Sequence, residues 1–99
     1  MNHADLVAVL KQYSGALHEN GATALFVFGS RARGNARPDS DLDLFIDYSP
    51  AAKIPSMFRL MQIEEGISDA LGIPVTITTR NALHPLMKEN IEREAIRII

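Results

Sequence analysis

The sequence predicts an α+β fold, in which a small three-stranded mixed sheet is flanked by helices. Two observations lead to this class. Apolar residues recur at helical spacing in three segments, and short runs rich in Val, Ile, Thr and Phe, as strands are, lie between them. With 99 residues the chain is long enough for one domain, over residues 1–99, and is near the lower limit for a core without disulfides or metals.

The first half of the chain contains a helix, a strand, a helical turn and a second strand, expected over residues 4–20, 22–28, 30–34 and 41–47. Asn20 and Gly21 give the helix a C-terminal stop. The first strand is a continuous apolar run, which is typical of a strand buried on both faces. The second strand alternates, so that Leu42, Leu44 and Ile46 share one face while its aspartates and Phe lie on the other.

The second half contains a helix, a third strand and a last helix, expected over residues 55–71, 73–78 and 82–97. Pro50 and Pro55 punctuate the approach to the first of these helices, and Gly72 ends it. Pro74 suits the start of a strand or an edge strand. The apolar C-terminal residues 96–99 either complete the core or lie in an interface with a partner.

The composition narrows the functional class. Ten basic and twelve acidic side chains give a net charge of -2, which does not favour general attraction to nucleic acid. Cysteine is absent, so disulfides and thiolate metal sites are excluded. The N-terminal residues lack a signal-peptide pattern, and the apolar runs are too short to cross a bilayer. We therefore expect a cytoplasmic protein that does not bind membranes, and its oligomeric state is open, a homo-oligomer included.

Two small residues, Gly29 and Ser30, follow the first strand and lead into the helical turn. Glycine lets the backbone turn tightly and approach a ligand closely. The amide groups that enter the helical turn form an anion-binding nest, to which the serine hydroxyl adds a donor. The alternative is an ordinary strand-to-helix turn with a serine cap.

Asp41 and Asp43 open the second strand. Residues two apart in a strand point to the same face, with Cα atoms about 6.6 Å apart. Two such carboxylates can converge on Mg²⁺, which accepts a few protein carboxylates and completes its shell with water and phosphates. The alternative is a solvated strand face, although aspartate is disfavoured in strands.

The turn and the aspartates fall at the same edge of the sheet if their two strands run antiparallel. Arg31, Arg33 and Arg37 lie in the connection and offer guanidinium groups to phosphate oxygens, with a solvated loop as the alternative. A phosphate cradle, cations and metal-binding carboxylates would then meet in one place. That is the layout of a phosphoryl- or nucleotidyl-transfer site.

Residues 29–34, Gly-Ser-Arg-Ala-Arg-Gly, followed by Ser-Asp-Leu-Asp-Leu at 40–44, resemble the signature of the minimal nucleotidyltransferases. These are small members of the DNA polymerase β-like nucleotidyltransferase superfamily. The resemblance extends over essentially the full chain and implies the nucleotidyltransferase fold. The catalytic and metal-binding residues are then expected to be Asp41 and Asp43, and the nucleotide-binding residues Gly29, Ser30, Arg33 and Ser40.

The resemblance also implies a reaction and a partner. Many family members are encoded beside a helical HEPN-domain protein and act as antitoxins, some by transferring AMP to a tyrosine of that partner. We therefore expect ATP as substrate, Mg²⁺ as cofactor, and a hydroxyl group of a HEPN-type partner protein as acceptor.

The third strand departs from the family pattern. Family members carry a third metal-binding aspartate in a Val-Asp-Leu-like sequence, and the matching residue here is Thr76. A threonine hydroxyl is a weak neutral ligand and cannot act as a general base. Asp47 lies about 13 Å along the strand from Asp43 and is a poor substitute. Asp39, Glu64 and Glu65 are further candidates, none of them compelling.

Two hypotheses of function stay open. The first is an active Mg²⁺-dependent nucleotidyltransferase that works with two aspartates. The second is a catalytically impaired module, degenerate at Thr76, that binds nucleotide or neutralises its partner by occlusion. A nucleic-acid-binding domain is a weaker third alternative, because the net charge is negative and aromatic residues are few.

Overall fold

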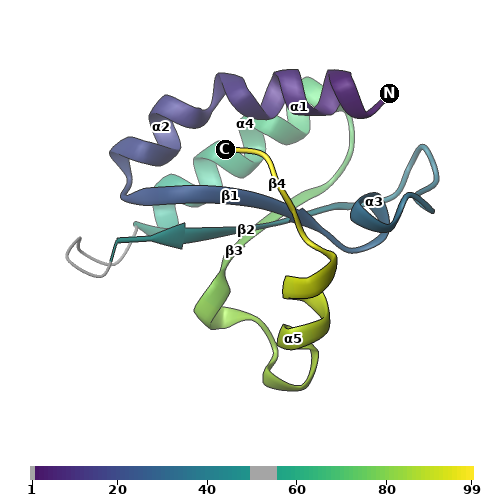
Figure 1. Cartoon of the computed structure of the whole chain (residues 1–99). Helices are drawn as coiled ribbons and strands as arrows, with labels where there is room; N and C mark the ends of the chain where they lie inside the picture. The colour runs from purple at the N-terminus through teal and green to yellow at the C-terminus, as the bar shows by residue number, and fades with distance from the viewer. Residues whose placement is uncertain (1, 50–55) are drawn as a thin grey trace.

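A computed structural model of the chain, which describes residues 2–49 and 56–99, contains a four-stranded mixed sheet with helices on both faces (Figure 1). Pro50 and Pro55, expected to punctuate the approach to the central helix, lie outside the described residues. The elements, in chain order, are α1 (His3–Gln12), α2 (Ser14–Glu19), β1 (Ala22–Phe28), α3 (Ser30–Arg33), β2 (Leu42–Tyr48), α4 (Met57–Leu71), β3 (Val75–Thr79), the 3-10 helix η1 (Arg80–Ala82), α5 (Pro85–Glu94) and β4 (Ile96–Arg97).

The strand order in the sheet is β3-β2-β1-β4. β1 is antiparallel to both of its neighbours, so that Phe28 is paired with Asp43 of β2. β2 and β3 run parallel, with α4 between them in sequence, and Asp43 is paired with Thr76 of β3. The mixed sheet predicted from the sequence is therefore confirmed. Its pairing places Asp43 between the end of β1 and Thr76 of β3.

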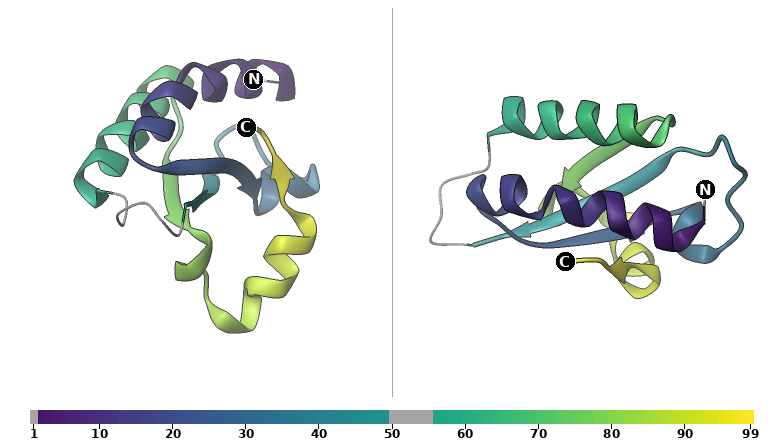
Figure 2. Two further views of the ribbon diagram at one scale, coloured as in Figure 1. Left: turned by 60° about the vertical axis from the view of Figure 1, so that its left-hand side comes forward. Right: turned by 90° about the horizontal axis from the view of Figure 1, so that it is seen from above.

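Helices α1, α2 and α4 cover one face of the sheet, and α5 lies on the other (Figures 1 and 2). The core under the three helices includes Leu42, Leu44 and Ile46, which are fully buried as their alternation predicts. Burying these side chains drives the helices onto the sheet, at about 1.5–3 kcal/mol for each large apolar side chain. None of the described helices combines the length and apolar character needed to cross a membrane.

The N-terminal helix, expected as one element over residues 4–20, is interrupted at Tyr13. The backbone there leaves helical geometry, with φ -95° and ψ 2°, and a new helix starts at Ser14. The Tyr13 ring packs against Gly66 of α4, where an added Cβ would lie 2.6 Å from the Tyr13 hydroxyl. The interruption therefore places the Tyr13 ring against α4 at Gly66, where any side chain would clash with it.

The C-terminal prediction is corrected by the structure. The last helix, expected over residues 82–97, ends at Glu94 because Ala95 adopts extended geometry, with φ -62° and ψ 141°. Residues Ile96–Arg97 then form a fourth strand on the free edge of β1, and the Ile98 amide donates to the Leu25 carbonyl at 2.8 Å. Ile98 and Ile99 pack against the core, as one of the two alternatives for this segment proposed.

The second face of the sheet is organised around Arg80. Phe26 and Phe45 stack with ring centroids 4.7 Å apart, and the Arg80 guanidinium lies 5.0 Å and 4.9 Å from their centroids. Arg80 also donates to both carboxylate oxygens of Asp47, at 2.6 and 2.9 Å, and to Glu92 of α5 at 2.6 Å. One side chain thereby attaches α5 to the sheet and helps to cover Phe45, which is fully buried.

Candidate active site

Gly29 brings the turn after β1 into contact with Asp43. Its backbone has φ 74° and ψ -153°, a region that essentially only glycine occupies. A Cβ at this position would lie 2.7 Å from Asp43 Oδ2. Because β1 and β2 are antiparallel, the turn and the aspartate meet at one edge of the sheet, as the sequence predicted.

Asp41 and Asp43 interact electrostatically. Asp41 is exposed and directly precedes β2, whereas Asp43 is half-buried within the strand. The pKa of Asp43 is raised from its ordinary value, first by burial and then by the charge of Asp41, while the charge of Arg33 lowers it. A divalent cation would relieve this repulsion, and two carboxylates are the hard oxygen ligands that Mg²⁺ takes in proteins. The residues present therefore fit a magnesium ion.

Thr76 stands beside Asp43 in the parallel pairing of β2 and β3, and its side chain is exposed. Paired residues of adjacent strands point to the same face, so the hydroxyl occupies the position at which a third carboxylate was expected. Among residues 2–49 and 56–99, no three His, Cys, Asp or Glu side chains are grouped so that they could hold a metal ion.

The carboxylates considered as substitutes are engaged elsewhere or stand in solvent. Asp47 is bound by Arg80, and Glu64 Oε2 accepts a hydrogen bond of 2.7 Å from the Ile77 amide on the outer edge of β3. Asp39 and Glu65 are exposed. The structure thus places none of the four beside Asp43 as a third ligand.

The short helix α3 carries Ser30 and Arg33, two of the expected nucleotide-binding residues. Ser30 is its first residue and is half-buried. The first amide groups of a helix have no partner within the helix. Arg33 is exposed and forms an ion pair of 3.3 Å with Glu94 of α5. Its charge acts on Asp43, so Arg33 lies on the carboxylate side of the sheet.

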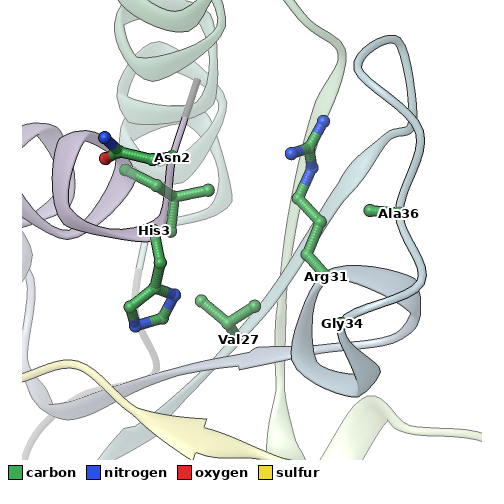
Figure 3. Close-up of a pocket in the computed structure, with 7 residues that line it drawn as sticks. Asn2, His3, Val27, Arg31, Gly34 and Ala36 are labelled. Carbon is green, nitrogen blue, oxygen red and sulfur yellow. The ribbon is translucent and has the colours of Figure 1, made fainter.

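Arg31 occupies a different position from Arg33. It lines a hollow of about 240 Å³ together with His3 and Leu6 of α1 and with Val27 of β1. In Figure 3 its side chain stands between α1 and the loop that carries Ala36. The arginines of this connection therefore do not form one cluster around the aspartates.

Ser40 participates in the turn that leads to Asp41. Its hydroxyl accepts a hydrogen bond of 2.8 Å from the Arg37 amide, and its own amide donates to the Arg37 carbonyl at 3.0 Å. These two bonds close the turn at residues 37–40. The Ser40 hydroxyl still has a proton to donate.

Arg80 is the main residue of this face that the sequence did not predict. Its pKa is raised from the ordinary value, chiefly by the hydrogen bond to Asp47 and then by that to Glu92. β2 and β3 run parallel, and Ile46 is paired with Thr79. The next residues after this pair, Asp47 and Arg80, therefore lie beside one another. That register was the one signal that could have placed Arg80 there.

Comparisons with known proteins agree with this fold. Residues 10–98 match the nucleotidyltransferase domain family. A candidate protein adenylyltransferase of Methanocaldococcus jannaschii is 33% identical over 97 residues, which cover 96% of each chain. The protein adenylyltransferase MntA of Thermococcus cleftensis is 28% identical over 95% of this chain and 93% of its own.

Solved structures give the same result. The structure of a candidate minimal nucleotidyltransferase is 34% identical in sequence, with a TM-score of 0.69 over 94% of this chain and 88% of that one. A toxin-antitoxin crystal structure with AMP-PNP has a TM-score of 0.72 over 94% and 72% of the two chains, at 14% identity, and supports the fold alone. Fold, signature and relatives coincide, and the chain belongs to the nucleotidyltransferase domain family, among its minimal nucleotidyltransferases.

Proposed function

We propose that the protein is a Mg²⁺-dependent nucleotidyltransferase that transfers AMP from ATP to a hydroxyl group of a partner protein. The observation that carries the proposal is the contact of Gly29 with the Asp43 carboxylate, beside Asp41. The contact supports the proposal because it puts the turn, as the proposed phosphate-binding element, beside the two carboxylates proposed to bind the metal. In nucleotidyl transfer, positioning and charge neutralisation supply most of the catalysis.

Each site residue has a role in this proposal. The turn at Gly29 and the hydroxyl of Ser30 hold the β- and γ-phosphates, and Arg33 neutralises charge on the phosphates. Binding of a triphosphate at Arg33 competes with its exposed ion pair to Glu94, which costs little to break. Asp41 and Asp43 hold Mg²⁺, which when bound supplies charge neutralisation at the phosphate oxygens. Ser40 stays a prediction as a nucleotide contact.

The acceptor is proposed from the relatives. One relative is named a protein adenylyltransferase, and the fold matches a toxin-antitoxin crystal structure. The family resemblance links such proteins to HEPN-domain partners. We therefore propose a tyrosine hydroxyl of a HEPN-type partner as the acceptor, with this chain acting as the antitoxin.

Labelled ATP tests the mechanism. The purified protein is incubated with ATP, Mg²⁺ and the protein encoded beside it, and label on that protein is counted. We expect Asp41→Asn and Asp43→Asn each to lower transfer by about 100-fold or more, because a metal clamp contributes several kcal/mol to the transition state. Asp39→Asn, which removes an exposed carboxylate from the same segment, serves as the matched control and leaves transfer unchanged. Transfer that survives both site substitutions would refute the mechanism.

A second candidate function rests on Thr76, the neutral residue beside Asp43. In this proposal the protein binds nucleotide with little turnover and neutralises its partner by occlusion. Thr76→Asp restores a carboxylate at an exposed position, and Thr78→Asp places one two residues further along the same face as its control. A gain in transfer of about 100-fold for Thr76→Asp alone supports the impaired module. Unchanged transfer, with an active natural protein, favours the two-aspartate enzyme.

A further inference from the structure

Arg31 projects to the opposite side of the sheet from Asp43, one of the two candidate metal ligands. It lines the hollow under α1 together with Val27, which packs in the core between the sheet and the helices. Leu42 and Leu44 also face that core, so Asp43, between them in β2, faces away from it. Although Arg31 follows Ser30 directly, its guanidinium therefore lies on the face of the sheet that α1, α2 and α4 cover (Figure 3).

The guanidinium of Arg31 is committed to the protein itself. Its Nη2 donates to the Ser40 carbonyl at 2.7 Å and more weakly to the Pro38 carbonyl at 3.4 Å. Its Nε is covered from solvent and has no hydrogen-bond partner among the described residues. A cation that is partly covered and bound to two carbonyls of one loop is poorly placed to bind phosphate oxygens.

The two carbonyls belong to the turn closed by the hydrogen bonds between Arg37 and Ser40. Those bonds join residues of the turn only to one another, so they shape the turn without placing it. The bond from Arg31 is different, because it joins the turn to α3. Since Ser40 directly precedes Asp41 and α3 starts just after Gly29, this contact connects both halves of the candidate site.

We propose that Arg31 is a positioning residue, which holds the turn at residues 37–40 against α3 and so sets where Asp41 stands relative to Asp43 and the turn at Gly29. The inference deepens the proposed function, because it rests on that proposal for the identity of the two aspartates as metal ligands. It assigns Arg31 a role distinct from that of Arg33, although the two lie one residue apart in the signature.

The first test measures the order of the turn without any ligand. Backbone ¹⁵N relaxation is recorded for the natural protein, for Arg31→Met, which keeps the apolar stem, and for Arg31→Lys, which keeps the charge and one donor nitrogen. We expect order parameters near 0.85 at residues 37–41 in the natural protein and values below about 0.6 in Arg31→Met, with other residues unchanged. Arg31→Lys is expected to restore part of the order.

The control is Arg37→Met, which alters an exposed side chain of the same turn whose bond to Ser40 uses only the backbone amide. Its order parameters should match those of the natural protein. Unchanged order in Arg31→Met, or a loss of order throughout the chain, overturns the proposal.

The second test separates metal binding from phosphate binding by calorimetry. For Arg31→Met we expect the Mg²⁺ concentration needed for half-saturation in the presence of ATP to rise by about tenfold, as for other residues that orient metal ligands. The affinity for metal-free ATP should stay unchanged. Arg33→Met should show the reverse pattern, with weaker metal-free ATP binding and the same Mg²⁺ requirement. A loss of metal-free ATP affinity in Arg31→Met would make it a phosphate ligand and overturn the inference.

If the natural protein binds no Mg²⁺-ATP, the proposed function fails. The relaxation experiment then still decides whether Arg31 holds the turn, because it needs neither nucleotide nor metal. The two failures are therefore distinguishable.

Discussion

Gly29 shows how far a single residue determines this site. Its φ of 74° and ψ of -153° would strain any side chain, and a Cβ would collide with Asp43 Oδ2. Both constraints act together, because the unusual backbone is what brings the main chain against the carboxylate. The glycine is therefore required by conformation and by contact at once.

At the scale of the residue, the raised pKa of Asp43 predicts that the candidate site lowers the free energy of unfolding at neutral pH. Because its pKa is raised in the folded protein, the free energy of unfolding falls as the pH rises from the ordinary value of 3.8 through the folded pKa. Asp43→Asn removes this loss. We expect the variant to melt at a higher temperature than the natural protein at pH 7, and at the same temperature near pH 3, below both pKa values.

Thermal unfolding followed from pH 3 to 7 measures this difference. Mg²⁺ provides the control, since it should stabilise the natural protein at pH 7 more than the variant. A variant that melts lower than the natural protein at pH 7 contradicts the argument.

Residues of the site differed in how far the sequence could predict them. The approach of Gly29 to Asp43 follows from antiparallel pairing of two adjacent strands, and it is confirmed. The separation of Arg31 from Arg33 could not be predicted. Each step along a helix turns the side chain by about 100°, and the side that a four-residue helix presents to the sheet is decided by the surrounding packing.

At the scale of the element, Gly66 and Tyr13 hold α4 against the interruption between α1 and α2. Alanine is favoured over glycine in a helix by about 1 kcal/mol. Gly66→Ala nevertheless pushes a methyl group into the Tyr13 ring, and overpacking costs about 1–3 kcal/mol. We expect Gly66→Ala to destabilise the natural protein by about 1 kcal/mol, and to stabilise a Tyr13→Leu variant.

Urea unfolding of the four proteins of this cycle gives the coupling energy. Gly15→Ala in α2 is the matched control, because a Cβ added there would have no atom within 4 Å. This substitution should stabilise both backgrounds. Additive effects of the substitutions at residues 13 and 66 would show that the packing contact carries no energy.

The elements also differed in predictability. Strands β1 and β2 have clear patterns, and their bounds agree with expectation to within one residue. The four-residue spacing of Leu83, Met87, Ile91 and Ala95 predicts a helix that extends to residue 97. Residues Ile96–Arg97 instead pair with the free edge of β1, and a strand of two residues gives no local sequence signal for such pairing.

At the scale of the whole molecule, Arg80 joins the aromatic cluster of the sheet to α5. Arg80→Met keeps apolar contact with the two rings but leaves Asp47 and Glu92 without their shared cation. We expect a loss of about 1–3 kcal/mol in the free energy of unfolding, less than for a fully buried pair because the side chains are about a third exposed. Arg80→Lys keeps the charge and should lose less.

Denaturant unfolding measures both losses. Arg93→Met, which breaks the exposed ion pair with Glu89 on α5, is the control and should change stability by less than about 0.5 kcal/mol. A loss in Arg80→Met no larger than that of the control would mean that α5 is held to the sheet by other contacts.

The order of the strands has a consequence for how the molecule assembles. The turn at Gly29 and both aspartates lie within one stretch from β1 to β2, so a short loop closure brings them together at a small entropic cost. Thr76 and α5 reach the same face only after the chain has passed through α4, which makes their closures longer. The residues proposed to bind a triphosphate are therefore brought together by a shorter closure than the one that brings Thr76 beside Asp43.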